Sequence, residues 1–479
     1  MEVDVTTVIS AVNGTLKRNG GARVVRTIST DTRSMRDGDV FLALQGPNFD
    51  GNSFATQAVE RGASGVISSD EATLERLAHA GAQCWLMLVD DTLWALGEIA
   101  ALWRKMMPLR HLAVIAGSSG KTTTKEMAAT VVKDRRDILV SEKNFNNLIG
   151  VPQNLMRIER HHICAVLEIG MNERGELKRL GRITQPTVAA YTNIGTAHVG
   201  QFGSLDGLLE AKGELLGELP ETALLIYNTD SPLMLELLKR NPRPNPVMTF
   251  GISGDADIRA EKIERIEPWG YKFEINVKNL KTYIELKVFG KHNIYNALCA
   301  AATLYGIGIP LEEIAAGIGR FLPCELRSEI EEFENLYIIK DCYNSSFEAA
   351  VEAIRELKHF AEGRGRSIAV LGDMRELGDF ETELHEKLGE KCVEEEIDVV
   401  VAVGQNGRSV AYPVIAKHRQ AYYYASPAEG ASFLADIAQP GDAILFKASR
   451  LLKFEDFIDL FKKKYMKHTL TESRGNTSQ

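Results

Sequence analysis

The sequence lacks the features typical of secreted, membrane-spanning or nucleic-acid-coating proteins. Its six cysteines are scattered without a Cys-x-x-Cys pair, which argues against disulfides or a cysteine zinc site and favours reduced, buried thiols. No apolar run is long enough to cross a bilayer, and the acidic start (Met-Glu-Val-Asp) differs from a signal peptide. A net charge of −9 argues against broad nucleic-acid binding. We therefore expect a cytoplasmic protein with no membrane insertion and no nucleic-acid partner.

The chain also has no internal repeat of about 20 to 50 residues, the period of solenoids and propellers. Its 479 residues exceed the size at which a single core keeps growing, so we expect several domains. An apolar fraction of 44% and a charged fraction of 25% are ordinary for a folded globular protein. The pattern along the chain divides it into residues 1–108, 109–322 and 323–479.

All three segments alternate short apolar strands with helices, which predicts an α/β fold. The first is a small α/β domain, with strands at residues 40–44, 65–68 and 85–89 and a helix at 93–107 that a proline ends. The second favours a parallel sheet with helices on both faces, built from strands at residues 112–116, 163–169, 187–194 and 223–228. A hairpin with strands 271–277 and 282–288 and a helix at 294–305 follow.

The third segment repeats the doubly wound pattern, which is typical of a Rossmann-like domain. Its expected strands are residues 337–341, 368–371, 399–403 and 443–446. Polar composition from residue 469 onward predicts a disordered tail.

The run at residues 114–124 (Val-Ile-Ala-Gly-Ser-Ser-Gly-Lys-Thr-Thr-Thr) has the pattern of a buried strand that enters a phosphate-binding loop. Gly117 and Gly120 let the backbone turn its N–H groups inward, Lys121 can neutralise phosphate charge, and Thr122 offers a hydroxyl to Mg²⁺. The general pattern has four residues between the glycines, whereas this loop has two. A chance helix cap is the alternative, but the strand before the loop and the helical pattern after it favour ATP binding, as in P-loop ATPases.

Three polar residues follow later strands, at the edge where doubly wound sheets bind their ligands. Glu168 closes an apolar strand, so its carboxylate is either a metal ligand or a buried charge that needs a partner, and a phosphate loop nearby favours the metal. The spacing of His198 fits a structural histidine better than a ligand. The pattern around Lys212 alone predicts a solvated helix lysine.

Several motifs together resemble the Mur ligases of peptidoglycan synthesis. They are the phosphate loop (117–126), Asn-Phe-Asn-Asn-Leu-Ile-Gly-Val-Pro (144–152), Leu-Glu-Ile-Gly-Met-Asn (167–172), Asn-Ile-Gly-Thr-Ala-His (193–198), Ala-Lys-Gly-Glu (211–214) and Gly-Lys-His-Asn-Ile-Tyr-Asn-Ala (290–297). Asp-Thr-Arg (31–33) with Gly-Pro-Asn-Phe-Asp-Gly (46–51) is similar to a uridine-nucleotide-binding domain of this family. Val-Leu-Gly-Asp-Met-Arg-Glu-Leu-Gly (370–378), His385 and Lys-Ala-Ser-Arg (447–450) are similar to its C-terminal domain.

This resemblance implies a site assembled from all three segments. It implies that four residues act in catalysis, namely Lys121, Glu168, His198 and Lys212, the last of them carbamylated into a carboxylate-like group. The implied ligands of two Mg²⁺ ions are Thr122, Glu168, His198 and Lys212. The implied ATP-binding residues are Gly117, Ser118, Ser119, Gly120, Lys121, Thr122, Thr123, Asn293, Arg327, Asp341 and Tyr343. The implied substrate-binding residues are Thr30, Asp31, Arg33, Gly46, Phe49, Asp50, Gly51, Asn146, Asn147, Asn344, Ser449 and Arg450.

The resemblance also implies the reaction. ATP would convert the terminal carboxylate of UDP-N-acetylmuramoyl-tripeptide (UDP-MurNAc-tripeptide) into an acyl phosphate, while Mg²⁺ and Lys121 screen the repulsion between the two anions. The amine of D-alanyl-D-alanine (D-Ala-D-Ala) would attack through a tetrahedral intermediate, and phosphate would leave. Since the implied nucleotide and substrate residues fall in both the second and third segments, we expect the third domain to close onto the second in a monomer.

The chain departs from the family pattern at three places. Cys-Tyr-Asn-Ser-Ser-Phe (342–347) replaces the usual Ala-Tyr-Asn-Ala-Asn-Pro, which alters a turn, Asn52 replaces a common histidine, and Ala448 replaces a usual glycine. The Asp-Asn-Pro-Arg motif of ligases that add a diamino acid is absent, which favours D-Ala-D-Ala or a related D-dipeptide as the amine.

Two other interpretations stay open. One is an amide ligase of the wider family, such as a folylpolyglutamate synthetase, and the uridine-nucleotide motifs near the N-terminus argue against it. The other is a nucleotide-binding homologue without turnover, and the intact set of Lys121, Glu168, His198 and Lys212 argues against that.

Overall fold

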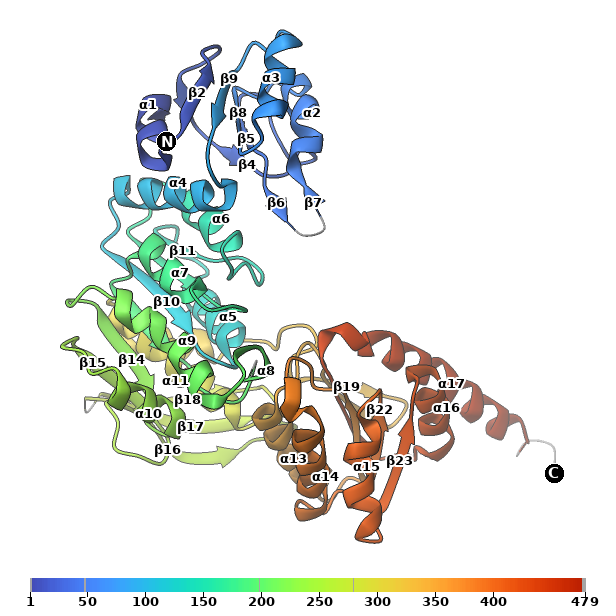
Figure 1. Ribbon diagram of the computed structural model, residues 1–479. Helices are drawn as coiled ribbons and strands as arrows, with labels where there is room; N and C mark the ends of the chain where they lie inside the picture. The colour runs from blue at the N-terminus through green and yellow to red at the C-terminus, as the bar shows by residue number, and fades with distance from the viewer. Residues whose placement is uncertain (1, 47–48, 198, 279, 476–479) are drawn as a thin grey trace.

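Three α/β domains follow one another along the chain in the computed structural model (Figure 1). The structure describes residues 2–46, 49–197, 199–278 and 280–475, without the side chains of the last seven. The first sheet stands at one end of the molecule on helix α4 (Thr92–Met106), and the third sheet lies beside the opposite end of the middle domain (Figure 1). A search of the described helices found none with the length and apolarity of a membrane span.

The first domain contains a five-stranded sheet in the order β2-β9-β8-β5-β4. Neighbouring strands are parallel except at the edge, where β2 is antiparallel to β9. Two short antiparallel pairs, β1 with β3 and β6 with β7, lie outside this sheet. The elements are β1 (Val3–Asp4), α1 (Val5–Val12), β2 (Thr15–Arg18), β3 (Val24–Val25), β4 (Ile28–Ser29), β5 (Val40–Leu42), β6 (Gln45–Gly46), β7 (Phe49–Asp50), η1 (Gly51–Phe54), α2 (Ala55–Glu60), β8 (Gly65–Ser68), α3 (Glu71–His79) and β9 (Trp85–Leu88).

The middle domain is built on a nine-stranded sheet in the order β11-β12-β10-β13-β14-β15-β16-β17-β18. The strands are parallel as far as β16, and β16, β17 and β18 form an antiparallel extension. The elements are β10 (His111–Ala116), α5 (Lys121–Val131), β11 (Ile138–Val140), α6 (Gly150–Met156), β12 (Cys164–Glu168), α7 (Glu176–Thr184), β13 (Val188–Tyr191), α8 (Val199–Phe202), α9 (Leu205–Glu218), β14 (Leu224–Asn228), α10 (Pro232–Arg240), β15 (Val247–Gly251), β16 (Ile258–Arg265), β17 (Tyr271–Val277), β18 (Leu280–Leu286), α11 (His292–Gly306) and α12 (Leu311–Ile318).

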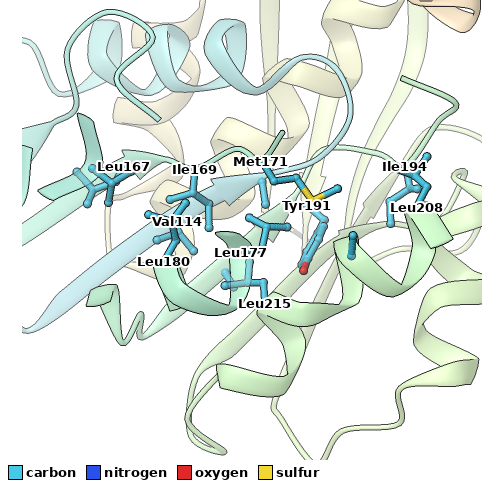
Figure 2. Packing of buried hydrophobic residues seen from close by; sticks show 14 of the residues in the cluster. Val114, Leu167, Ile169, Met171, Leu177, Leu180, Tyr191, Ile194, Leu208 and Leu215 are labelled. Carbon is cyan, nitrogen blue, oxygen red and sulfur yellow. The ribbon is translucent and has the colours of Figure 1, made fainter. Parts of the chain in front are cut away.

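The alternation of side chains along β10 explains why helices cover both faces of this sheet. Val114 packs with Leu180 of α7 and Leu215 of α9 on one face (Figure 2). Its neighbour Ile115 packs on the other face with α5 and α11. Burying each such side chain contributes about 1.5–3 kcal/mol, so the two layers fix the strand that carries the phosphate loop.

The third domain contains a six-stranded sheet in the order β19-β20-β24-β21-β22-β23, parallel except for the edge strand β19. Helices α13 and α14 pack on one face of it, and α16 and α17 pack on the other. The elements are β19 (Glu329–Phe333), β20 (Leu336–Asp341), α13 (Phe347–Ala361), β21 (Ser367–Gly372), η2 (Gly378–Phe380), α14 (Glu381–Glu394), β22 (Val399–Val403), α15 (Gly407–Ala416), β23 (Gln420–Tyr424), α16 (Pro427–Ile437), β24 (Ala443–Lys447), η3 (Arg450–Leu452) and α17 (Phe454–Gly475).

The predicted α/β fold with a parallel central sheet is confirmed, and all six cysteines are free thiols. Three local predictions were wrong. The strand expected at residues 187–194 already ends at Tyr191. The hairpin link is shorter than expected, because Leu280 and Lys281 already pair with β17. The chain after residue 469 does not lose its structure at once, since α17 continues to Gly475. Extending a helix that is already anchored by buried Phe457 and Phe461 costs little, so polar residues can follow it. The divisions after residues 108 and 322 stay predictions.

Candidate active site

The loop between β10 and α5 needs glycine at two positions. Gly117 has a φ of +136°, and a Cβ there would lie 2.1 Å from the Thr192 hydroxyl oxygen. Gly120 has a φ of +81°, and a Cβ there would lie 2.1 Å from Oδ1 of Asn296. Only glycine adopts these conformations at such close contact without strain. The two glycines therefore turn the chain within a short loop at the carboxyl edge of the sheet.

The segment after β13 holds this loop in shape. The Ser118 N–H donates to the Asn193 carbonyl (3.0 Å), and the Ser119 N–H donates to Asn193 Oδ1 (3.1 Å). The Gly195 N–H donates to the Ser118 hydroxyl (3.0 Å). Helix α5 begins after the loop, with Thr122 and Thr123 in its first turn and no side-chain cap on its N-terminal N–H groups. Uncapped N–H groups at a helix N-terminus are a ready site for a phosphate.

Two lysine amines converge on the carbonyl of Gly117. Lys121 Nζ donates to the carbonyls of Gly117 (2.9 Å) and Ser118 (3.1 Å), and Lys212 Nζ lies 3.4 Å from the Gly117 oxygen. Burial lowers the pKa of Lys121, although the Glu168 carboxylate opposes this. Burial and the charge of Lys121 lower the pKa of Lys212 well below its ordinary value. The interpretation of Lys212 as a solvated helix lysine is therefore wrong, because its side chain is buried under the loop.

Glu168, at the end of β12, is a buried carboxylate with only one of its two oxygens hydrogen-bonded. Its Oε1 accepts a hydrogen bond from Asn146 Nδ2 (2.7 Å), whereas its Oε2 is buried without a hydrogen-bond partner. An unpaired buried carboxylate oxygen is costly unless a cation binds it, and oxygen is the ligand atom that Mg²⁺ prefers. The described residues contain no group of three or more His, Cys, Asp or Glu side chains that could hold a metal. A metal here would therefore also need other ligands, such as hydroxyl, phosphate or water oxygens.

Arg327, just before β19, connects the third domain to the phosphate loop. Its Nη2 lies 3.4 Å from the Thr122 hydroxyl, and its guanidinium stacks 3.9 Å from the centre of the Tyr343 ring. Arg450 approaches the same ring at 5.9 Å and pairs with Glu455 (2.6 Å). The structure therefore brings Thr122, Arg327 and Tyr343 together, and their roles in ATP binding stay predictions.

Asn293 and Asp341 are both held by neighbours rather than free. Asn293 Nδ2 donates to the Phe289 carbonyl (2.8 Å), and its Oδ1 accepts from Asn296 (2.9 Å). Asp341, at the end of β20, pairs with buried Lys447 (2.9 Å). These contacts orient both side chains at the junction of the middle and third domains, and a role in nucleotide binding stays a prediction for each.

The substrate residues predicted in the first domain lie around the β6–β7 pair and the loop after β4. The hydroxyl of Thr30 accepts a hydrogen bond from Gln153 of α6 (3.0 Å), which links this loop to the middle domain. Asp31 pairs with Arg33 (2.7 Å), whose side chain is largely exposed. Phe49 is half-exposed and stacks on Phe54 with ring centres 5.6 Å apart. The remaining predicted residues lie in or directly after the β6–β7 strand pair and are Gly46, Asp50 and Gly51.

The other predicted substrate residues make internal contacts of their own. Asn147 Oδ1 accepts from the Gly150 N–H (2.9 Å) at the start of α6, while Asn146 holds Glu168. Asn344 accepts a hydrogen bond from Lys447 through its carbonyl (2.7 Å). Ser449 is buried, and its hydroxyl accepts from the Arg375 N–H (3.1 Å). Their substrate roles stay predictions, and His198 lies outside the described residues.

Sequence reasoning missed Lys125, which lies one helical turn after Lys121. Its side chain is buried, pairs with Glu126 and donates to the Lys143 carbonyl (3.0 Å). Nothing in the pattern distinguishes it from a solvated helix lysine. Lys125 and Asn193, which shapes the loop, both lie in motifs of the family resemblance, and those motifs are the available signal.

Models of known protein families match most of this chain. Three family models match in order along the chain: "Mur ligase family, catalytic domain" at residues 24–104, "Mur ligase middle domain" at 115–304 and "Mur ligase, glutamate ligase domain" at 325–450. The middle model begins at the strand that carries the phosphate loop and ends in α11.

Relatives match over nearly the whole length. A UDP-N-acetylmuramoyl-tripeptide–D-alanyl-D-alanine ligase of Bacillus subtilis is 34% identical over 91% of this chain and 93% of its own. The crystal structure of MurF from Acinetobacter baumannii matches with a TM-score of 0.86 at 29% identity, covering 97% of this chain and 99% of that one. MurF from Thermotoga maritima in complex with ADP matches with a TM-score of 0.79 at 25% identity, covering 93% and 99%. The chain belongs to the Mur ligase family.

Proposed function

We propose that this chain is an ATP-dependent ligase that joins D-Ala-D-Ala to UDP-MurNAc-tripeptide and releases ADP and phosphate. The observation that carries the proposal is the convergence of a phosphate loop, two lysine amines and a half-paired buried carboxylate at one edge of the middle sheet. The substrates are those named for the Bacillus subtilis relative. The enzyme would act in the cytoplasm as a monomer in the synthesis of peptidoglycan precursors.

The first step would transfer the γ-phosphoryl group of ATP to the carboxylate of the tripeptide. A carboxylate oxygen attacks phosphorus, the bond to the β-phosphate oxygen breaks, and ADP leaves. The N–H groups at the start of α5 and the Lys121 ammonium would cradle the phosphates, which reduces the repulsion between two anions. For this, Lys121 would turn from the carbonyls of Gly117 and Ser118 toward the nucleotide.

In the second step, the amine of D-Ala-D-Ala would attack the acyl carbon. Phosphate leaves, an amide bond forms and the amine loses a proton. Ser449 and Arg450 of the third domain, with Asn344, would hold the peptide substrates. Since Arg327 reaches Thr122 in the middle domain, the third domain would complete the nucleotide site when it is closed on the middle domain, as in this arrangement.

The residues present fit magnesium. Bound Mg²⁺ would neutralise phosphate charge and polarise the reacting oxygens. Thr122 and the unpaired Oε2 of Glu168 would hold two ions together with His198 and a carbamylated Lys212. Carbamylation needs an unprotonated amine, and burial of Lys212 beside the charge of Lys121 lowers its pKa in the direction that favours this form.

The test is phosphate release from ATP with UDP-MurNAc-tripeptide, measured with and without D-Ala-D-Ala. We expect release that requires both substrates, together with a new amide product in mass spectrometry. Release that is independent of both, or no release at all, contradicts the proposal. A folate substrate with glutamate serves as the control amine–acid pair and should give no release.

A further inference from the structure

The segment that follows β13 contacts the third domain as well as the phosphate loop. Figure 1 shows α8, which ends this segment, on the side of the middle domain that faces the third domain. Glu348, in the first turn of α13, accepts two hydrogen bonds from Thr196. The Thr196 N–H donates to its Oε1 (2.8 Å) and the Thr196 hydroxyl donates to its Oε2 (3.2 Å). One carboxylate of the third domain therefore binds two donors of the middle domain.

A second contact lies four residues further on and involves backbone alone. The Gly200 N–H donates to the carbonyl of Glu376 (3.2 Å) in the loop before η2. A Cβ on Gly200 would lie 2.1 Å from the Gly378 nitrogen, and a Cβ on Gly378 would lie 2.8 Å from the Gly200 Cα. The two glycines allow the chains to approach more closely than any side chain permits.

The same segment is bonded to the phosphate loop at its other end. Gly195 contacts Ser118 through two hydrogen bonds, one in each direction (3.0 and 3.3 Å), and Asn193 holds Ser119. Asn193 and Gly195 therefore contact the phosphate loop, while Thr196 and Gly200, a few residues later, contact the third domain. His198 lies outside the described residues, and the contacts with the third domain come from its neighbours Thr196 and Gly200.

We propose that Glu348 and the Gly200–Gly378 contact form a closure latch, which fixes the third domain on Thr196 and Gly200 in the arrangement that catalysis requires. A single contact would leave the domain free to pivot, whereas two contacts on one short segment fix its orientation. Glu348, Gly200 and Gly378 are positioning residues, because they act on the phosphate loop through this segment. The inference rests on the proposed function for its kinetic effects, but its geometry does not depend on which amine is ligated.

Two variants break the latch at its two points. Glu348→Ala removes the acceptor of both Thr196 donors, and Gly200→Ala places a methyl group against the Gly378 backbone. Matched controls exist for each. Glu352→Ala removes a carboxylate from the same helix that pairs with Arg355 of its own domain, and Gly217→Ala adds a methyl group to a helix where it meets open space.

The first measurement is small-angle X-ray scattering of the full chain with Mg²⁺, a non-hydrolysable ATP analogue and UDP-MurNAc-tripeptide. We expect larger dimensions for Glu348→Ala and Gly200→Ala than for the wild type and both controls. The second is steady-state kinetics. We expect kcat to fall about tenfold in Glu348→Ala, from the loss of charge-assisted hydrogen bonds, and about a hundredfold in Gly200→Ala, from misplacement of the domain. The KM for ATP should change less than kcat, and equal melting temperatures would show that both variants fold.

Three outcomes would overturn the latch. Unchanged scattering in both variants would show that these contacts do not hold the domain. Opening in Gly200→Ala alone would remove Glu348 from the latch. A rise in kcat for Glu348→Ala would mean that this carboxylate blocks the Thr196 donors. If the wild type makes no product, the proposed function fails, but scattering still decides on the latch.

Discussion

The middle and third domains place similar loops at the carboxyl ends of their parallel strands and use them in opposite ways. In the middle domain, Gly117 turns the chain after β10, and the N–H groups at the start of α5 have no side-chain cap. In the third domain, Gly404 turns the chain after β22 with a φ of +121°, and a Cβ there would lie 2.5 Å from Asp373 Oδ1. Both loops therefore bring backbone donors to a confined position.

The difference is what occupies that position. In the third domain, the buried Asp373 carboxylate accepts hydrogen bonds from the N–H groups of Gln405 (3.1 Å) and Asn406 (2.9 Å). Arg375 lies 3.3 Å from the same carboxylate. The third domain thus supplies its own anion, whereas the middle domain offers its donors and Lys121 to an anion from outside. Parallel-sheet topology provides such sites, and one acidic side chain decides whether a site is open.

The comparison is tested most severely by Lys121→Ala. If the middle loop is open to ATP, loss of this ammonium should lower phosphate release with both substrates by about 10³-fold, a typical effect of losing one group that stabilises developing charge. Lys133→Ala, which changes an exposed lysine after the same helix, serves as the control and should keep full activity. An active Lys121→Ala enzyme would mean that the loop is not the phosphate site.

Glu168→Gln tests whether the middle site is built for a cation as well as an anion. The glutamine side chain has the same size and can still contact Asn146. It carries no negative charge, and one of its two terminal atoms is an NH₂ group instead of an oxygen. We expect an activity about 10²-fold lower at fixed Mg²⁺, with partial recovery at high Mg²⁺. A titration of activity against Mg²⁺ measures this. An unchanged Mg²⁺ dependence would indicate that Glu168 is only a structural acid.

Asp373→Ala would open the third-domain site. Removing the carboxylate leaves the N–H groups of Gln405 and Asn406 without an acceptor, so the unfolding free energy should fall by about 2 kcal/mol. Sulfate should restore part of the loss in thermal unfolding, since it can occupy the vacated position. The wild type is the control and should gain less from sulfate. Equal gains in both proteins would contradict the idea that Asp373 fills an anion site.

The sequence predicted the phosphate loop of the middle domain better than the Asp373 site of the third domain. The phosphate loop combines glycines with a lysine and a preceding apolar strand, so its chemistry is local in the sequence. Asp373 was recognised only as part of a motif, because its partners Gln405 and Asn406 lie on another strand's loop. Lys212 shows the same limit, since its amine contacts the carbonyl of Gly117, which lies far away in the chain.

The fold follows a similar rule. The strand β22, which is buried on both faces, was predicted with its correct bounds because every residue in it is apolar. The strands β16 and β19 were missed because their exposed faces carry charged residues, as in Glu-Ile-Glu-Glu-Phe of β19, an edge strand of the third sheet. Contacts between domains, including Thr196 with Glu348, leave no periodic signal in a single sequence.

The smallest expected effect concerns how the stability of the third domain, around Asp373, depends on pH. His385 is fully buried, and its Nε2 accepts from the Met374 N–H (2.9 Å) beside Asp373. Burial lowers the pKa of His385, so the unfolded chain binds the proton more tightly than the folded one. This contribution to stability is complete above the ordinary histidine pKa near 6.5 and is lost as the pH falls from there toward the folded pKa, by at most about 1.4 kcal/mol per pH unit.

His385→Gln can accept the same hydrogen bond without titrating. Between pH 7.5 and 5.5, the third domain of the wild type should therefore lose about 1 kcal/mol more stability than that of the variant. All four tryptophans lie outside the third domain, so tryptophan fluorescence does not report on its unfolding. Hydrogen exchange of the β21 amides measures the stability of this domain instead. Exchange of β10 is the internal control, because hydroxyl and amide groups hold the middle loop and do not titrate in this range. An equal loss of β21 protection at low pH in both proteins would show that titration of His385 does not affect the stability of the third domain.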